Sequence, residues 1–213
     1  MSQTAAPFHP RQERSRATLE RLLGATIGVL DQEGLEGAVI PRIAALAGMA
    51  PANIYRRFAD KPALLRAAFL HALDQSQQAN SATLATQLRA PALAAASRKL
   101  VRLLFQQYRR HPHFLRALNR FVEMDTDPDF VRQVRAALGN NLDQVVAILL
   151  AHRAEIVHKE PAAALRFAIL NTTCSIEAYT LDPHAMWHAG TGIGERELAD
   201  RLTRSFVAYL TAA

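Results

Sequence analysis

Apolar side chains recur every three or four positions along most of the chain, which is the period of an amphipathic helix. The first such stretch runs to Gln32 and is followed by Gly34, a residue that ends helices. Stretches with the same period cover residues 61–73, 91–110, 113–122, 128–149 and 195–212. Alternation of apolar and polar residues, the mark of a half-buried strand, does not persist over a useful length. The pattern therefore predicts an all-α fold.

The helix predicted for residues 161–181 has an unusual pattern. Between Ala162 and Leu181 only Arg166 and Glu177 are charged, and their spacing places them on one side of the helix. We expect this helix to be buried on more than one side and to pair with the final helix, residues 195–212, in a four-helix dimer interface. The expected contact residues are Ile169, Thr173, Ile176, Leu198, Leu202 and Phe206.

Residues 40–58 predict two short helices joined by a tight turn. Gly48 allows a reversal of the chain through positive φ, and Pro51 suits the first position of the second helix. That helix, predicted over residues 51–58, buries Ile54 and Phe58. It directs a polar face outward, made of Ala52, Asn53, Tyr55, Arg56 and Arg57. The segment is a candidate helix-turn-helix. The alternative is an ordinary antiparallel helix pair with a solvated basic face.

The run NIYRRFADKPALLRAAF resembles the signature of the tetracycline-repressor (TetR) family. In that family a helix-turn-helix ends in Tyr-x-x-Phe and is followed by a turn, a lysine and a leucine-rich fourth helix. The matching positions are Tyr55, Phe58, Lys61 and Leu64. The similarity covers about residues 11–72. The family's usual Thr, Ser and Gly are replaced by Val39, Ala50 and Ala52, so details of phosphate contact differ here.

The resemblance implies a domain organisation. We expect a disordered arm over residues 1–10 and a three-helix DNA-binding domain with its connecting fourth helix over residues 11–72. Residues 73–213 then form a helical domain for ligand binding and dimerisation. The implied function is that of a transcriptional regulator, most often a repressor, that binds a near-palindromic operator as a homodimer and is released by a small-molecule inducer.

Roles in DNA binding follow from matched positions and from side-chain chemistry. Tyr55, Arg57 and Lys61 match positions from which the family contacts phosphates, and Ala52 matches one beside the DNA backbone. Arg42, at the start of the preceding helix, is a further phosphate candidate. Asn53 and Arg56 are candidates for base edges, because amide and guanidinium groups pair bidentately with adenine and guanine.

The resemblance also implies a cavity in the helical body, and such cavities are mostly apolar with a few placed polar groups. We expect an apolar or aromatic inducer, with a cationic or hydrogen-bonding end facing Glu177. The candidate lining residues are Phe105, Tyr108, Phe121, Met124, Asn141, Gln144, Asn171, Cys174, Glu177 and Trp187. A DNA-binding regulator without an inducer is the alternative.

Composition narrows the function classes. The 213 residues carry a net charge of +6, which favours polyanionic partners, and a single cysteine, Cys174, which excludes an intramolecular disulfide. A secretory signal and an apolar run of roughly 20 residues are both lacking, so we expect a cytoplasmic protein without membrane association.

A helical metal-dependent oxidoreductase is the alternative from another class. Its basis is a Glu-x-x-His pair, Glu155 and His158, but di-iron bundles need a second copy and further glutamates. Two histidines four apart, His184 and His188, do not make a metal site by themselves. We therefore expect no cofactor and no enzymatic activity.

Overall fold

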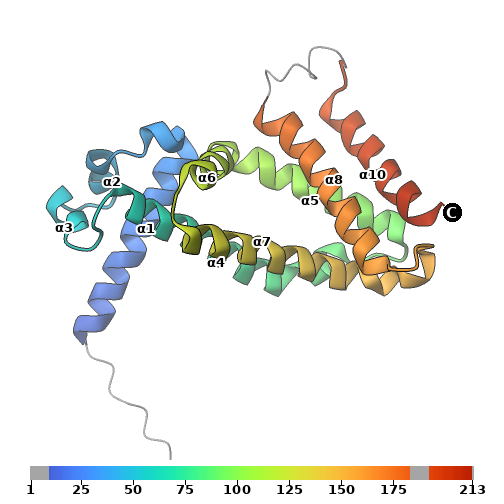
Figure 1. Cartoon of the computed structure of the whole chain (residues 1–213), viewed down its shortest axis with the longest axis horizontal. Helices are drawn as coiled ribbons and strands as arrows, with labels where there is room; N and C mark the ends of the chain where they lie inside the picture. Colours follow the sequence, from blue (N-terminus) through green and yellow to red (C-terminus); the bar gives the residue numbers. More distant parts are fainter. Residues whose placement is uncertain (1–9, 183–191, 213) are drawn as a thin grey trace, which may run out of the picture. The chain divides into compact units, whose positions relative to one another are not determined.

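The computed structural model describes residues 10–182 and 192–212, and the regular elements within these ranges are all helices (Figure 1). The predicted all-α fold is confirmed. The chain divides into two compact units, Met1–Ala72 and Leu73–Ala213.

The first unit contains α1 (Pro10–Gly37), α2 (Ile40–Leu46), α3 (Pro51–Tyr55) and the beginning of α4 (Lys61–Leu88). Gly34 interrupts α1 with φ 70° and ψ −164°, a backbone conformation that a side chain would strain. The unit's core side chains come from every one of these helices and include Leu22, Leu30, Ile43, Ile54, Leu64 and Phe69.

The turn between α2 and α3 has the geometry expected from the sequence. Gly48 has φ 62°, and the Met49 N–H donates to the Ala44 carbonyl at 3.0 Å, which closes α2. Pro51 then begins α3. This second helix ends at Tyr55, earlier than predicted, because the Arg57 and Phe58 N–H groups both donate to the Ile54 carbonyl and the helix closes in a tight turn there. Phe58 is therefore half-buried, whereas the sequence predicted burial.

The second unit contains the rest of α4 together with the remaining described helices. These are α5 (Leu93–Arg110), α6 (Pro112–Met124), α7 (Pro128–Leu149), η1 (Leu150–Glu155), α8 (Pro161–Leu181) and α10 (Glu195–Thr211). Proline occupies the first turn of α6, α7 and α8, where its missing N–H costs no helical hydrogen bond.

Three helices of this unit, α5, α8 and α10, pack against one another (Figure 1). One cluster of buried side chains joins Val101, Phe105, Ile176 and Leu202. A larger cluster includes Leu93, Leu100, Leu149, Leu165 and Phe206. Burial of these apolar side chains is the main stabilising contribution to such a bundle.

The residues Gly139-Asn140-Asn141 do not interrupt α7, which is continuous from Pro128 to Leu149. Polar contacts with α4 support this part of the helix. Asn80 Nδ2 donates to Asn141 Oδ1 at 3.4 Å, and Gln144 Nε2 donates to Ser81 Oγ at 3.0 Å. The polar end of α4 also stays helical, because Leu84 and Leu88 anchor it to the core.

None of the described helices combines the length and the apolar character that a membrane crossing requires.

Candidate nucleic-acid interface

The short helix α3 carries its polar side chains on the surface of the first unit. Ile54 is only 1 % exposed and anchors the helix to the core. Ala52, Asn53 and Tyr55 are exposed on the other side, with the Tyr55 ring 55 % accessible. The Tyr55 side chain is therefore accessible to an external partner.

Positive charge is concentrated around α3. Residues 37–59 contain no acidic side chain, while Arg42, Arg56 and Arg57 all lie in this segment and are exposed. Arg57 Nη1 donates to Ser15 Oγ on α1 at 3.4 Å, so the two elements lie together at this edge of the unit. A surface of this kind attracts polyanions and offers several N–H donors to phosphate oxygens.

The two remaining phosphate candidates lie at helix starts. Arg42 is in the first turn of α2 and forms an ion pair with Glu33 of α1, with the Arg42 Nη2 to Glu33 Oε1 distance being 2.8 Å. Lys61 is the first residue of α4 and is half-buried. Asp60, just before it, accepts from the Ala63 N–H at 2.7 Å and caps α4, as its position in the sequence indicates.

The residues expected at a dimer interface are mostly buried within this chain. Ile176 and Leu202 pack with Val101 and Phe105, because α10 already covers that side of α8. Ile169 and Phe206 belong to the larger core cluster, whereas Thr173 and Leu198 are half-buried. Within the chain, α8 is therefore buried on one side.

The opposite side of α8 is exposed, and Arg166 at its edge pairs with Asp143 of α7. Phe167 is 54 % and Leu170 59 % exposed. The Tyr209 ring of α10 lies beside Phe167, with ring centroids 5.1 Å apart. We refer to Phe167, Leu170, Cys174 and Tyr209 as the outer face of α8 and α10.

A polar cluster joins α5, α6 and α8. Tyr108 OH donates to Glu177 Oε2 at 3.2 Å, and Asn119 Nδ2 donates to Glu177 Oε1 at 2.6 Å. Burial raises the pKa of Tyr108, and the nearby Glu177 charge raises it further. Asn119 was not predicted, because its partner lies on another helix and no spacing along one helix could reveal it.

Among the other predicted ligand residues, Phe105 belongs to the buried cluster against which Tyr108 packs, whereas most of the rest lie elsewhere. Phe105 and Phe121 are buried, but they contact different rings, Tyr179 and Phe130. Asn141 and Gln144 bond to α4, as described above. Three further candidates are exposed on the surface, namely Met124, Asn171 and Cys174. Trp187, like His184 and His188, lies outside the described residues.

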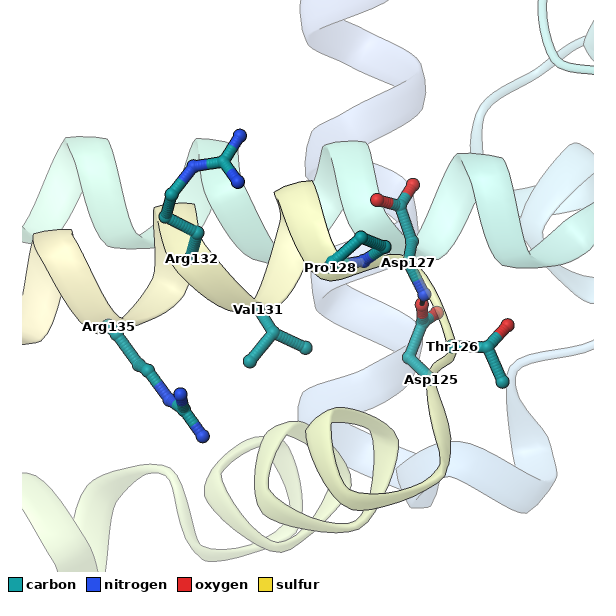
Figure 2. A pocket seen from close by; sticks show the side chains of 7 residues that line it. All are labelled: Asp125, Thr126, Asp127, Pro128, Val131, Arg132 and Arg135. Carbon is teal, nitrogen blue, oxygen red and sulfur yellow. Dashed lines mark hydrogen bonds between the residues drawn. The ribbon is translucent and has the colours of Figure 1, made fainter.

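Two surface hollows in the second unit are lined by other residues. One, of about 430 Å³, lies at the start of α7 and is lined by Asp125, Thr126, Asp127, Pro128, Val131, Arg132 and Arg135. Figure 2 shows Arg135 and Val131 on one side of α7 and Arg132 on the other. The second hollow lies along α4 between Asp74 and Ala82. Neither contains a predicted ligand residue.

The Glu-x-x-His pair serves the helix ends instead of a metal. Glu155 Oε1 accepts from the Leu93 N–H at 2.9 Å, which caps α5. His158 Nε2 lies 2.6 Å from the Tyr209 carbonyl oxygen near the end of α10. Over residues 10–182 and 192–212, no group of three or more His, Cys, Asp or Glu side chains is arranged to hold a metal ion.

The segment that contains this interface is similar to a known protein family. The family model for bacterial regulatory proteins of the tetR family matches residues 22–68, which span α2, α3 and the adjoining parts of α1 and α4. A comparison with curated proteins found no match.

Solved structures resemble the chain over most of its length. A TetR-family regulator from Streptomyces coelicolor is 21% identical with a TM-score of 0.63, and the match covers 91% of this chain and 80% of that one. The regulator FadR from Bacillus subtilis, solved in complex with stearoyl-CoA, is 15% identical with a TM-score of 0.60 over 91% of this chain and 97% of its own. FadR from Bacillus halodurans is 14% identical with a TM-score of 0.61 over 88% and 97%. At these identities the similarity establishes the fold.

Proposed function

Since the first unit is a DNA-binding domain of the TetR family, we propose that this transcriptional regulator is a repressor that binds a near-palindromic operator as a homodimer. The observation that carries the proposal is the exposed polar face of α3 above a buried Ile54. A helix that is buried on one side and polar on its exposed side can enter the major groove of a DNA duplex.

Roles within the interface follow from chemistry and position. Asn53 and Arg56 read base edges in the major groove, where amide and guanidinium groups make bidentate contacts. Tyr55, Arg57 and Lys61 contact phosphates and fix the register of the domain on the duplex. Ala52 lies beside the DNA backbone, and Arg42 supplies one more phosphate contact.

A homodimer explains the exposed outer face of α8 and α10. Apolar side chains as large as Phe167 and Leu170 gain free energy when a second copy covers them. A two-fold pair also presents two copies of α3 to successive turns of one duplex, about 34–36 Å apart. The residues predicted at the interface then lie beneath this face or at its edges and support it. They are Ile169, Thr173, Ile176, Leu198, Leu202 and Phe206.

A small-molecule inducer is the second part of the proposal. The cluster of Tyr108, Asn119 and Glu177 beside the buried Phe105 offers polar anchors next to apolar surface. The B. subtilis neighbour of the same fold was solved with stearoyl-CoA, so long-chain acyl-CoA belongs among the first compounds to test. Cationic aromatic compounds test the alternative that Glu177 faces a positive group.

Inducer and operator must weaken each other reciprocally, because each favours a different spacing of the two DNA-binding domains. Compounds that raise the melting temperature of the protein are therefore added to the protein–DNA complex. Release of DNA supports an inducer. Hits that stabilise the protein but leave DNA affinity unchanged favour a regulator without a small-molecule inducer.

The oxidoreductase alternative lacks support, since Glu155 and His158 both bond to helix ends. The main proposal is tested by incubating the purified protein with fragmented genomic DNA and sequencing the retained fragments. Enrichment of a two-fold symmetric sequence is expected. Retention of fragments without any shared sequence would contradict sequence-specific regulation.

A further inference from the structure

Arg42 is held by an acidic residue that the sequence analysis did not single out. The Arg42 Nε donates to Glu33 Oε1 at 2.8 Å, and Arg42 Nη2 lies 2.8 Å from the same oxygen. Glu33 is the residue before the break in α1 at Gly34, and Arg42 lies in the first turn of α2. The pair therefore spans the connection between the two helices.

The path of the chain fixes the Glu33 side chain. A Cβ atom at Gly37 would lie 2.3 Å from Glu33 Cβ, so only glycine leaves room for this side chain. The Gly37 carbonyl in turn accepts from the Val39 N–H at 2.7 Å, just before α2 begins. Glu33 thus packs closely against the connection that its carboxylate spans.

The outer edge of the Arg42 guanidinium remains free. A guanidinium carries five N–H donors, and the contacts to Glu33 involve Nε and Nη2 alone. The Arg42 side chain is 58 % exposed, compared with 35 % for Glu33. The acid therefore lies on the inner side of the arginine, and the remaining donors face solvent.

We propose that Glu33 is a positioning residue for DNA binding, which orients Arg42 so that a DNA phosphate accepts from its exposed edge. The proposal rests on the proposed function. An arginine that is already oriented loses less side-chain freedom when it binds. Against this, the Glu33 charge repels the phosphate, although water and salt screen that repulsion at an exposed site. Removing the Glu33 charge should weaken DNA binding if orientation of Arg42 dominates and should strengthen it if repulsion dominates. A single substitution of Glu33 therefore distinguishes the two effects.

The test compares Glu33→Gln with Glu20→Gln. Glu20 forms an exposed ion pair with Arg16 on the same helix, at 2.9 Å, and both substitutions raise the net charge by one. Bulk charge alone strengthens binding in both variants. If Glu33 positions Arg42, Glu33→Gln instead weakens binding by roughly threefold to tenfold, the scale of ordering one flexible side chain on binding.

Dissociation constants are measured by fluorescence anisotropy at several salt concentrations. The probes are the duplex that the full-length wild-type protein retains from a random-sequence pool and a scrambled duplex of equal length. Weakening should be equal on both duplexes, because a phosphate contact carries no sequence information. If the Glu33→Gln protein binds the duplexes as tightly as the Glu20→Gln protein, or more tightly, the positioning role is overturned.

A double-mutant cycle removes the remaining ambiguity. Arg42→Ala should reduce the slope of log affinity against log salt by about 0.9, the value for one phosphate contact. In the Arg42→Ala protein, adding Glu33→Gln should no longer weaken binding and should change the affinity only as Glu20→Gln does; an undiminished loss there would overturn the proposal, because Glu33 then acts through something else. Arg42→Lys keeps the charge but not the planar fork, and adding Glu33→Gln to it should likewise produce no loss of affinity.

The outcomes also separate this inference from the proposed function. If the wild-type protein binds DNA and the Glu33→Gln protein binds it equally well, with an unaltered circular dichroism melting curve, only the positioning role is overturned. A wild-type protein that binds no duplex overturns both.

Discussion

Arg56 carries the most specific expectation at the scale of single residues. If its guanidinium pairs with a guanine, Arg56→Ala should cost about 1–3 kcal/mol on the preferred duplex, or roughly fivefold to 150-fold in affinity. The loss on a scrambled duplex should be smaller, because only a charge is removed there. Fluorescence anisotropy titrations give the ratio of the affinities for the preferred and the scrambled duplex.

Arg57→Ala is the matched control, since it removes the same charge from the neighbouring position and should weaken both duplexes alike. An affinity ratio that Arg56→Ala leaves at the wild-type value would show that Arg56 does not read bases.

Tyr108 should make folding stability depend on pH in the alkaline range. Burial, and then the Glu177 charge, raise the pKa of Tyr108 above its ordinary value of about 10. The folded state therefore keeps the proton when the unfolded state releases it, so this contribution is fully present below about pH 10 and is lost as pH rises further.

Tyr108→Phe should lose about 1 kcal/mol near neutral pH, the net value of one hydrogen bond, and should show a smaller decline in stability above about pH 10. Urea unfolding at a series of pH values measures both effects. Tyr55→Phe, at an exposed ring, serves as control. An alkaline decline as steep as that of the wild type would contradict the role of Tyr108.

The sequence could predict which side chains of α3 face outward, because Ile54 identifies the buried side and the helical period then places the other side chains. It could not predict that Ser15 and Glu33 contact the arginines Arg57 and Arg42. Those partners lie on α1, and only the packing of helices brings them together.

Helix starts were the most predictable feature at the scale of elements. Pro128 and Pro161 each lie in the first turn of a helix, as the sequence predicts, and Asp127 Oδ1 accepts from the Asp129 N–H at 2.9 Å. The start of α5 was less predictable. It begins at Leu93 rather than at Pro91, and its cap comes from Glu155, which is distant in sequence.

That distant cap gives a prediction for α5. Ala92 precedes the helix and has no side-chain oxygen, so Glu155→Ala leaves the Leu93 N–H without its acceptor. The free energy of unfolding should fall by about 1 kcal/mol, the usual value of a helix cap. Urea denaturation monitored by circular dichroism measures it.

Glu123→Ala, at an exposed position on α6, is the control, and Glu155→Gln should recover part of the loss because the amide oxygen also accepts. Equal stability of the Glu155→Ala and Glu123→Ala proteins would contradict the capping role.

At the scale of the whole molecule, the outer face of α8 and α10 predicts the assembly. Phe167→Glu combined with Leu170→Glu should give a folded monomer with much weaker operator binding, because charges at a buried apolar interface are costly. Leu138→Glu is the control, since Leu138 is 51 % exposed on α7, outside this face. Multi-angle light scattering that finds an unchanged dimer would rule out this face.

Sequence reasoning could predict an unusually apolar α8 but not which of its sides stays exposed. That depends on how α10 packs, and Leu202 and Phe206 turn out to lie in the core. Charged substitutions at these two positions should therefore unfold the second unit rather than only dissociate a dimer.

The central claim is sequence-specific binding of duplex DNA through α3, and its most direct test is the affinity of the wild-type protein for its selected duplex and for a scrambled one across a range of salt. We predict at least about a thousandfold preference for the selected duplex, with log affinity falling linearly as log salt rises. Equal affinity for the two duplexes, or binding that does not respond to salt, would contradict the account.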